Sequence, residues 1–350
     1  MNLRPRRILI VLHGSIGDVA RALPLANTLR RAYPEATLAW SVEPPSAPLV
    51  ARHPAVDEVI VFDRPRWWRA LPAFARRIRN GRFDLVLDLQ RHFKSGLVSL
   101  LSGAPVRLGF HRLDAKEGNW IFNNHFIPAF GDGLPKLEHY MKFADYLGLE
   151  RGPLEWRLEI DAAEAAAVRR LLEGVSARFA VLFAGARWES KRWFADQIAE
   201  CARMLQQRYD LDVVLLGGKD EAAIAAEAVR RHGERIADLV GRTSLREALG
   251  VIARAQVAVG PDTGLAHLAA AVGTPVISLW GATSPLRTGP HGFGHLALQG
   301  RAPCAPCYRR RCPIGRICMR SIAVEEIADK VQLALAEGPD AKRGTSGFGA

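Results

Sequence analysis

No stretch of this sequence approaches the roughly 20 consecutive apolar residues that a helix needs to cross a bilayer. The chain also has no G-x-G-x-x-G dinucleotide fingerprint and no Walker motif. It shows neither a glycine–aromatic RNA-binding signature nor a zinc-finger histidine pair. These absences exclude a helical membrane-spanning protein and argue against the commonest nucleotide-binding and nucleic-acid-binding modules.

A secretion signal is also missing from the first residues. Met1–Arg7 is basic, but the apolar run Ile8–Leu12 is shorter than a signal-peptide core, and His13 and Gly14 end it. We therefore interpret residues 7–12 as a first strand and expect a cytoplasmic protein.

Acidic residues are fewer than basic residues in this sequence. The 350 residues include 48 Lys and Arg against 36 Asp and Glu, which gives a formal net charge of +12. Such a balance favours anionic partners, namely nucleic acid, anionic lipid or phosphorylated substrates. Without a nucleic-acid signature, we expect phosphorylated substrates and an anionic membrane surface rather than nucleic acid.

Apolar strands alternate with helical patterns along most of the chain, and the alternation restarts after Pro153. Strands are expected at 7–12, 37–42, 59–63, 83–89, 179–184, 212–217, 238–240, 256–259 and 275–280. Helices are expected at 19–33, 71–80, 195–209, 220–232, 245–253 and 264–272. This order predicts two doubly wound α/β domains with parallel sheets, over 1–160 and 161–335, and a ligand cleft between them. The Gly-rich and polar tail 338–350 is predicted to be disordered.

The segment Gly260–Ala271 carries the strongest local signal in the chain. A strand ends in Gly-Pro, an Asp262-Thr263-Gly264 turn follows, and an alanine-rich helix begins. Free N–H groups and the dipole at a helix N-terminus attract anions, and glycine allows a phosphate to approach. Asp262 has the residue type and position of an N-cap. The alternative is a capped helix that binds nothing.

Two further loops follow predicted strands. Gly14 and Gly17 precede Asp18, a carboxylate at a helix start that can accept a proton from a substrate hydroxyl or can simply be an N-cap. In the second domain, Ser190 and Lys191 can bind phosphate oxygens, or belong to a solvated loop.

Four of the five cysteines lie close together, at positions 304, 307, 312 and 318. Clustering in a cytoplasmic protein argues against a disulfide framework. Four thiolates in one short loop can enclose structural zinc or iron, so Cys304, Cys307, Cys312 and Cys318 are candidate ligands. Free thiols and a pair of disulfides are the alternatives. The fifth, Cys201, is expected to be a buried apolar residue.

Arginines and tryptophans are mixed in Arg64–Arg69, and more arginines follow in Arg76–Arg79. Such a surface suits anionic lipid headgroups, although a solvated basic helix with packed tryptophans fits equally well. Arg91 and Lys94 follow a predicted strand end and can contact acidic groups of a substrate, or can simply face water at a helix start.

The combination of these motifs resembles glycosyltransferase family nine, the bacterial lipopolysaccharide heptosyltransferases, over residues 7–335. The segments that carry the resemblance are Gly14–Asp18, Asp84–Gln90, Lys94–Ser95, Arg107–Phe110, Lys191–Trp193, Asp262–His267, Gly273–Pro275 and Gly281–Pro285. The resemblance implies a GT-B fold, in which two Rossmann-like domains face a cleft. It also implies a nucleotide-diphosphate heptose donor, usually ADP-heptose, and the lipid A–Kdo core glycolipid as acceptor at the cytoplasmic face of the inner membrane.

By position, the resemblance implies that Asp18 is the general base of an inverting transfer. It also implies that Lys191 contacts the donor phosphates and that Asp262, Thr263, Gly264 and His267 form the donor-binding segment. From their own positions, we add Ser190 to the donor set and expect Gly17, Arg91 and Lys94 on the acceptor side. Catalysis then needs no obligatory cofactor, because a helix N-terminus and Lys191 can stabilise the departing diphosphate. The other readings are a family member with a different donor or acceptor, a nucleotide-sugar epimerase, and a non-catalytic anion-binding protein.

Overall fold

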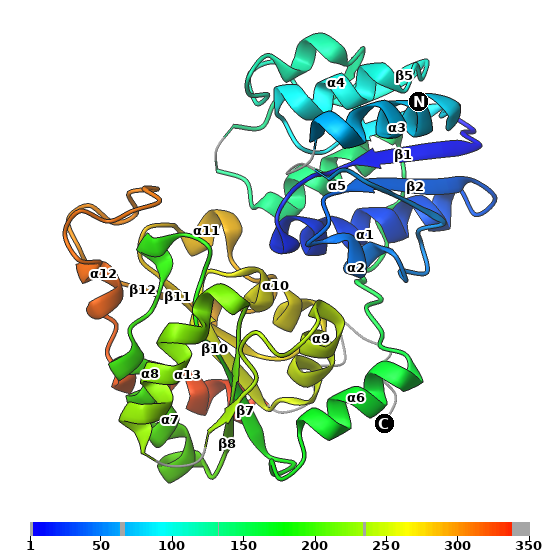
Figure 1. Ribbon diagram of the computed structural model, residues 1–350. Coiled ribbons are helices and arrows are strands. Elements are labelled where there is room, and N and C mark those ends of the chain that lie inside the picture. Colours follow the sequence, from blue (N-terminus) through cyan, green and yellow to red (C-terminus); the bar gives the residue numbers. More distant parts are fainter. Residues whose placement is uncertain (1–2, 64–66, 132, 234–235, 338–350) are drawn as a thin grey trace. The chain divides into compact units, whose positions relative to one another are not determined.

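The computed structural model describes residues 3–63, 67–131, 133–233 and 236–337. Contacts divide the chain after Arg157 into two compact units, which are described separately (Figure 1). The tail 338–350, predicted to be disordered, lies outside the described residues. Among the described residues, every helix is too short or too polar to cross a membrane.

The first unit is built on a six-stranded parallel sheet in the order β3-β2-β1-β4-β5-β6. The strands are β1 Arg7–Val11, β2 Thr37–Val42, β3 Glu58–Val61, β4 Leu85–Asp88, β5 Val106–Gly109 and β6 His125–Phe126. Its central strands β1 and β4 are buried, because helices cover both faces of a doubly wound sheet.

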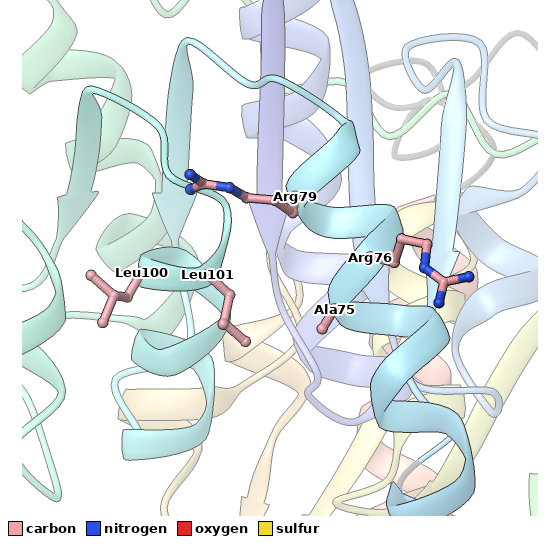
Figure 2. A pocket seen from close by; sticks show the side chains of 5 residues that line it. All are labelled: Ala75, Arg76, Arg79, Leu100 and Leu101. Carbon is pink, nitrogen blue, oxygen red and sulfur yellow. The ribbon is translucent and has the colours of Figure 1, made fainter.

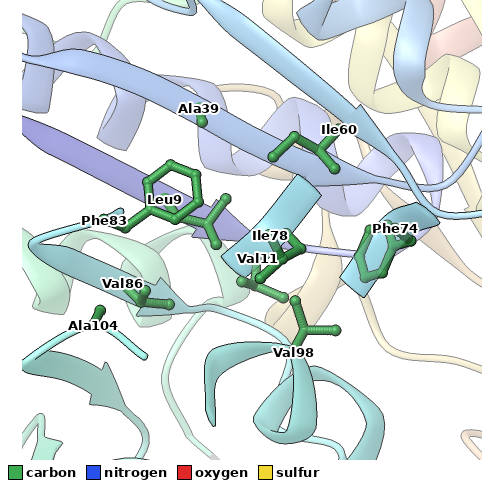
Figure 3. Close-up of a cluster of buried hydrophobic side chains, with 10 residues drawn as sticks. All are labelled: Leu9, Val11, Ala39, Ile60, Phe74, Ile78, Phe83, Val86, Val98 and Ala104. Atoms are coloured by element: carbon green, nitrogen blue, oxygen red, sulfur yellow. The ribbon is translucent and has the colours of Figure 1, made fainter. Parts of the chain in front are cut away.

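The helices of this unit are α1 Ile16–Ala32, α2 Ala47–Val50, α3 Trp67–Asn80, α4 Phe93–Leu101, the 3₁₀ turn η2 Asn119–Phe122 and α5 Lys136–Leu147. Successive side chains of a strand point to opposite faces, and Leu9 and Val11 of β1 point toward α3 and α4. There they join a buried cluster with Phe74 and Ile78 of α3 and Val98 of α4 (Figure 3). Helices α1 and α5 pack against each other.

The second unit repeats the plan with a six-stranded parallel sheet in the order β12-β11-β10-β7-β8-β9. The strands are β7 Phe179–Phe183, β8 Asp212–Leu216, β9 Ala237–Asp238, β10 Val257–Pro261, β11 Val276–Trp280 and β12 Leu298–Gln299. The α-helices are α6 Ala162–Leu171, α7 Ala195–Tyr209, α8 Ala222–His232, α9 Leu245–Arg254, α10 Gly264–Ala271, α11 Pro285–Thr288, α12 Ile317–Arg320 and α13 Val324–Ala336. Short 3₁₀ turns are η3 Glu189–Lys191, η4 Lys219–Glu221 and η5 Gly294–Leu296.

The predicted alternation of strands and helices is confirmed, and the two doubly wound sheets have the predicted parallel order. Helix α7 has the predicted bounds, whereas α1 begins at Ile16 rather than Val19. The reason is a capping box, in which the Ser15 side chain bonds the Asp18 amide and the Asp18 carboxylate bonds the Ser15 amide. Gly17 and Asp18 therefore lie inside the first turn of α1.

In each sheet the strand order reverses once, and the candidate residues lie at that reversal. β1 and β4 are neighbours, but the chain proceeds from them toward opposite edges of the sheet, and so it does from β7 and β10. Ligands of doubly wound folds bind at the carboxyl ends of the strands at such a switch point. The loops there are His13–Ser15 and Leu89–His92 in the first unit, and Ala184–Trp188 and Asp262–Thr263 in the second.

Candidate functional site

At the switch point of the first unit, two loops are joined by their own hydrogen bonds. The His13 amide donates to Gln90 Oε1 at 2.6 Å, and Gln90 Nε2 donates back to the His13 carbonyl at 3.2 Å. Gln90 follows β4 and His13 follows β1. This reciprocal pair holds the start of the Gly14–Asp18 loop against the neighbouring strand.

Asp18 is the third residue of α1, and its carboxylate accepts several bonds. Oδ2 accepts from the Ser15 amide at 3.1 Å and from the Ser15 hydroxyl at 3.0 Å. The N-cap of α1 is Ser15, so the alternative in which Asp18 is the N-cap is wrong. A Cβ on Gly14 would lie 2.7 Å from Asp18 Cβ, which explains why glycine is needed at position 14.

Two cations share the other oxygen of Asp18. Arg21 Nη2 donates to Oδ1 at 2.8 Å, and Lys136 Nζ of α5 donates to the same oxygen in a very short contact. Burial alone would raise the pKa of Asp18, but Lys136 and Arg21 outweigh it and hold that pKa far below its usual range. Asp18 is therefore an ionised carboxylate with its charge compensated inside the unit.

The residues predicted to bind an acceptor lie in different surroundings. Gly17 is buried in α1. Arg91 has a left-handed backbone with φ of 71°. Its Nε donates to the Asp114 carbonyl at 2.5 Å, and its guanidinium lies over the ring of Phe110 at 5.3 Å. Lys94 is exposed on the first turn of α4. Arg91 is thus built into the fold, whereas Lys94 faces solvent.

Tyr140 of α5 lies near the charges of Asp18, Arg21 and Arg91. The side chain is fully buried, and burial raises the pKa of its hydroxyl well above the usual range. Asp18 raises that pKa further, whereas Arg21 and Arg91 lower it, so all three charges act on one buried ring. Arg21 could have been linked to Asp18 by its i,i+3 spacing on a helix, whereas Tyr140 and Lys136 had no signal in the sequence that linked them to Asp18.

A second carboxylate, Asp88 at the end of β4, is completely buried. It accepts from Asn119 Nδ2 at 2.6 Å and from the Gln90 amide at 3.2 Å. Burial raises the pKa of Asp88, and the bonds from Asn119 and Gln90 only partly oppose that shift. Because its partners are neighbouring loops, Asp88 fixes the carboxyl edge of the sheet and does not face a ligand.

In the second unit, residues after β7 and β10 form one ion pair. Lys191 Nζ lies 2.5 Å from Asp262 Oδ2, which also accepts from Thr283 Oγ1 at 2.8 Å. His267 Nε2 lies 3.9 Å from the other oxygen of Asp262. The structure therefore brings together Lys191, Asp262 and His267, which are three residues of the predicted donor set.

Asp262 was predicted to be an N-cap, and this is wrong. The N-cap of α10 is Thr263, whose side chain makes no capping bond, and Gly264 is the first helical residue. Asp262 does not cap because Lys191 and Thr283 bind its carboxylate. The amide groups that open α10 consequently follow a carboxylate whose charge is balanced by an ammonium group, so Asp262 does not cancel the positive end of the helix.

Ser190 is directed toward the cysteine-rich segment. Its buried hydroxyl donates to the Arg309 carbonyl at 2.5 Å, and its amide donates to the Arg310 carbonyl at 3.2 Å. The Cys312 amide donates to Glu189 Oε2 at 2.9 Å. The η3 turn that carries Lys191 is therefore also the platform on which residues 309–312 are docked.

The thiols of Cys304, Cys307 and Cys312 lie near the thiol of Cys318. This thiol is buried, and its pKa is raised first by burial and then by the nearby thiols of Cys312, Cys304 and Cys307. Within the described ranges, however, no group of three or more His, Cys, Asp or Glu side chains is arranged to hold a metal ion. Cys201 is completely buried in α7, as expected.

The basic and aromatic segment lies partly outside the described residues, because Arg64, Pro65 and Arg66 are not described. In α3, Trp68 is 60% exposed, and Arg69 and Arg76 face solvent. The neighbouring helix α4 exposes apolar side chains at Phe93, Leu97 and Leu100. We call the surface formed by Trp68, Arg69, Arg76, Phe93, Lys94, Leu97 and Leu100 the α3–α4 face.

This face is hollowed in two places. A cavity of about 400 Å³ is lined by Phe62, Leu71, Phe74, Phe93, Lys94, Leu97, Val98 and Leu101. A second hollow is lined by Ala75, Arg76, Arg79, Leu100 and Leu101 (Figure 2). Apolar walls with cationic side chains beside them therefore characterise the face.

A family model described as glycosyltransferase family 9 (heptosyltransferase) matches residues 71–318. The lipopolysaccharide core heptosyltransferase OpsX of Haemophilus influenzae is 26% identical over 294 residues, which cover 82% of each chain. Lipopolysaccharide heptosyltransferase 1 of Pseudomonas aeruginosa is 30% identical over 325 residues, which cover 87% of each chain.

The solved structure of ADP-heptose lps heptosyltransferase II from E. coli has a similar fold. Its TM-score is 0.74 at 24% sequence identity, and the match covers 95% of this chain and 99% of that chain. The predicted GT-B-type fold, with two parallel-sheet α/β domains, is confirmed by this likeness.

Protonation of His13 should destabilise the first unit. The ring is buried, stacks on Phe62 and lies 2.8 Å from Ser41 Oγ, and burial lowers its pKa from 6.5 to about 4. Between these values the unfolded chain binds a proton that the folded unit does not, so stability falls with falling pH. We expect a loss of about 2 kcal/mol from this group between pH 7 and pH 5.

Urea unfolding at both pH values measures the effect. His13→Gln keeps a polar group near Ser41 but cannot titrate, and should lose about 2 kcal/mol less than the wild type on acidification. His111→Gln, at a partly exposed position of the same unit, should behave as wild type. Equal acid losses in wild type and His13→Gln would show that His13 does not titrate as described.

Proposed function

Because this chain belongs to glycosyltransferase family 9, the heptosyltransferase family, we propose that it transfers heptose from ADP-heptose to the inner core of lipopolysaccharide. The names of its relatives support this substrate pair, since both are lipopolysaccharide heptosyltransferases. The structural neighbour is named for ADP-heptose. The acceptor in this proposal is a Kdo or heptose residue of the lipid A–core glycolipid.

One observation supports the donor half of the proposal above all others, namely the contact between Lys191 and Asp262 at the switch point of the second sheet. It fixes an ammonium group where α10 begins. We assign the diphosphate to this position, with Lys191 and the amides of Gly264 and its neighbours as donors. Thr263 and His267 complete the donor site. Ser190 belongs to it through the η3 turn that it anchors, because its hydroxyl is bonded to Arg309.

The acceptor half of the proposal centres on Asp18. In an inverting displacement, the acceptor oxygen forms a bond to the anomeric carbon while the bond from that carbon to the diphosphate breaks. The acceptor hydroxyl proton passes to Asp18, and the departing ADP takes the electron pair of the broken bond. Lys191 and the N-terminus of α10 stabilise the charge that develops on the diphosphate. Gly17, Arg91 and Lys94 are assigned to the acceptor side.

Replacement of the proposed base should separate turnover from donor binding. Asp18→Asn keeps the size of the side chain but removes its basicity, so transfer from ADP-heptose to a core glycolipid should fall by roughly 10²- to 10⁴-fold. The affinity for ADP, measured by calorimetry, should stay within about twofold of wild type. Glu35→Gln, an exposed carboxylate next to the C-terminal end of α1, is the matched control and should behave as wild type.

The complementary variant is Lys191→Met, for which the expected loss is in ADP affinity, by roughly 10- to 100-fold, the range of a hydrogen bond to a charged group. Wild-type turnover by Asp18→Asn would remove Asp18 from the mechanism. Absence of heptose transfer by the wild type, while another nucleotide sugar is used, would overturn the substrate assignment.

We further propose that the α3–α4 face binds an anionic membrane surface, so that the protein works peripherally at the cytoplasmic face of the inner membrane. The proposal is supported by the composition of the face: exposed Trp68, Phe93, Leu97 and Leu100 lie among Arg69, Arg76 and Lys94. Apolar side chains enter the headgroup region, while arginines bind lipid phosphates. A lipid-anchored acceptor makes such an attachment useful.

Vesicle sedimentation tests this attachment. Binding to phosphatidylcholine vesicles that contain phosphatidylglycerol should exceed binding to phosphatidylcholine alone. Arg76→Gln should weaken it about fivefold, the value of one basic residue near an anionic surface. Leu97→Ser should also weaken it, whereas Leu113→Ser, 75% exposed outside this face, should not. Equal binding to both kinds of vesicle would contradict the proposal.

The cysteine-rich segment is proposed to hold structural zinc or iron. The three thiols close to Cys318 and the thiol of Cys318 itself make four soft donors that suit either metal, although within the described residues these side chains are not arranged to hold one. The metal would have no role in the transfer step, which the chain's own residues perform. When bound, it would fix residues 304–318 and so support the η3 turn that carries Lys191.

Elemental analysis of the purified protein tests this assignment. We expect about one zinc or iron per chain in the wild type and a clear loss in Cys307→Ser. Cys201→Ser removes a thiol that is buried elsewhere in the unit and should keep the metal. A metal-free wild type prepared without chelators would contradict the assignment.

A further inference from the structure

The donors that bind Asp18 leave little room for a substrate. A carboxylate offers about four lone-pair positions, and here Oδ1 accepts from Arg21 and Lys136 while Oδ2 accepts from the amide and the hydroxyl of Ser15. An acceptor hydroxyl that is to deliver its proton to Asp18 needs one of these positions. One of the present donors must therefore leave before the proton can be transferred.

Three of the four donors are fixed by α1 itself. The Ser15 amide donates within the capping box that begins the helix, and the Ser15 hydroxyl oxygen accepts from the Asp18 amide in the same box. Arg21 lies one turn further along, and its side chain is only 9% exposed. Displacing the amide or Arg21 would disturb the first turn of α1 or uncover a buried guanidinium group. The hydroxyl can turn its proton away, but both cations would then remain on the carboxylate and keep it a weak base.

Lys136 differs from these three donors in its helix, in the exposure of its side chain and in its place at a helix start. It comes from another helix, 118 residues further along the chain, and its side chain is 26% exposed. It is the first residue of α5, where the helix dipole disfavours a positive charge. The preceding residue, Pro135, provides no capping bond. Lys136 is thus the cation with the least support from its own helix and the best access to a ligand.

We propose that Lys136 is a positioning residue that occupies Asp18 in the free enzyme and is drawn away by an acidic group of the acceptor. The carboxylate or phosphate of the bound acceptor takes over the ammonium group. Oδ1 of Asp18 then loses one donor and receives the acceptor hydroxyl. As the new glycosidic bond forms, the proton moves to Asp18, and Lys136 remains protonated on the acidic group. This inference rests on the proposed function and adds a requirement for an acidic acceptor.

The strength of the base supports this sequence of events. Lys136 is the larger of the two cationic influences that hold the pKa of Asp18 down, and a carboxylate with a very low pKa is a weak proton acceptor. Arg21 on α1 remains beside the carboxylate after Lys136 has left, so Asp18 stays ionised. Tyr140 on α5 is a further titratable group near Asp18: the Asp18 carboxylate raises the pKa of this tyrosine, whereas Arg21 and Arg91 lower it.

The test compares Lys136→Met with Lys142→Met, a lysine on the same helix that does not contact Asp18. Transfer is measured as kcat/KM against pH, with an acidic core acceptor and with a neutral analogue whose carboxyl groups are reduced and phosphates removed. We expect the acid limb of the profile to move to higher pH by at least about 1 unit in Lys136→Met, because an opposite charge beside an Asp shifts its pKa by that order. Lys142→Met should keep the wild-type profile.

Discrimination between the two acceptors is the second readout. The wild type should prefer the acidic acceptor by roughly 10- to 100-fold, and Lys136→Met should lose most of this preference through a higher KM for the acidic acceptor and a higher kcat for the neutral one. Lys136→Arg keeps the charge and should restore the preference. Thermal unfolding of all variants shows whether a change reflects misfolding.

Two failures are distinguishable in this experiment. If the wild type transfers heptose, but Lys136→Met has the pH profile and the acceptor preference of Lys142→Met, the role of Lys136 is overturned and the proposed function stands. If the wild type does not transfer heptose to either acceptor, the proposed function itself fails, and with it the inference.

Discussion

The reversal of strand order in each sheet is the constraint on which the rest of this structure depends. It places the loop after β1 beside the loop after β4, and the loop after β7 beside the loop after β10. Without it, Lys191 and Asp262, 71 residues apart, would have no reason to meet. The pairing of His13 with Gln90, 77 residues apart, has the same origin. The strand order alone therefore places the loops that carry the candidate residues side by side at each edge.

Both edges also hold a carboxylate against a lysine. In the first unit Asp18 binds Lys136 and Arg21, and in the second Asp262 binds Lys191 and Thr283. Partly buried ion pairs are weak evidence for stability, because desolvation offsets much of the attraction. What these pairs provide here is orientation, because each fixes a charged group at a defined place at the carboxyl edge of its sheet.

Much of the fold was predictable, because strands buried on both faces of a parallel sheet are nearly continuous apolar runs. Residues 37–42 and 195–209 were predicted with their observed bounds. Helix α5 was missed, although its apolar residues Leu137, Tyr140, Met141, Ala144 and Leu147 recur at helical spacing. The start of α1 was readable in principle, because Ser15 followed three positions later by Asp18 has the spacing of a capping box.

The candidate site was predictable only where its residues are close in sequence. Asp18, Lys191 and the segment Asp262–His267 were proposed from local motifs, and Lys191 does meet Asp262, but the partners of Asp18 and Ser190 were not predicted. Lys136 lies 118 positions from Asp18, and Arg309 lies 119 positions from Ser190. The expectation that Asp262 caps α10 failed for the same reason, because no local pattern shows that a distant lysine binds its carboxylate.

The glycine at position 14 has a consequence for how related sequences are sorted. A methyl group there would collide with both the Cβ and a carboxylate oxygen of Asp18. A homologue that keeps the aspartate but carries a larger residue in place of this glycine must therefore hold the aspartate side chain in a different position. The glycine–aspartate pair, rather than the aspartate alone, therefore identifies chains that hold this carboxylate in the same place.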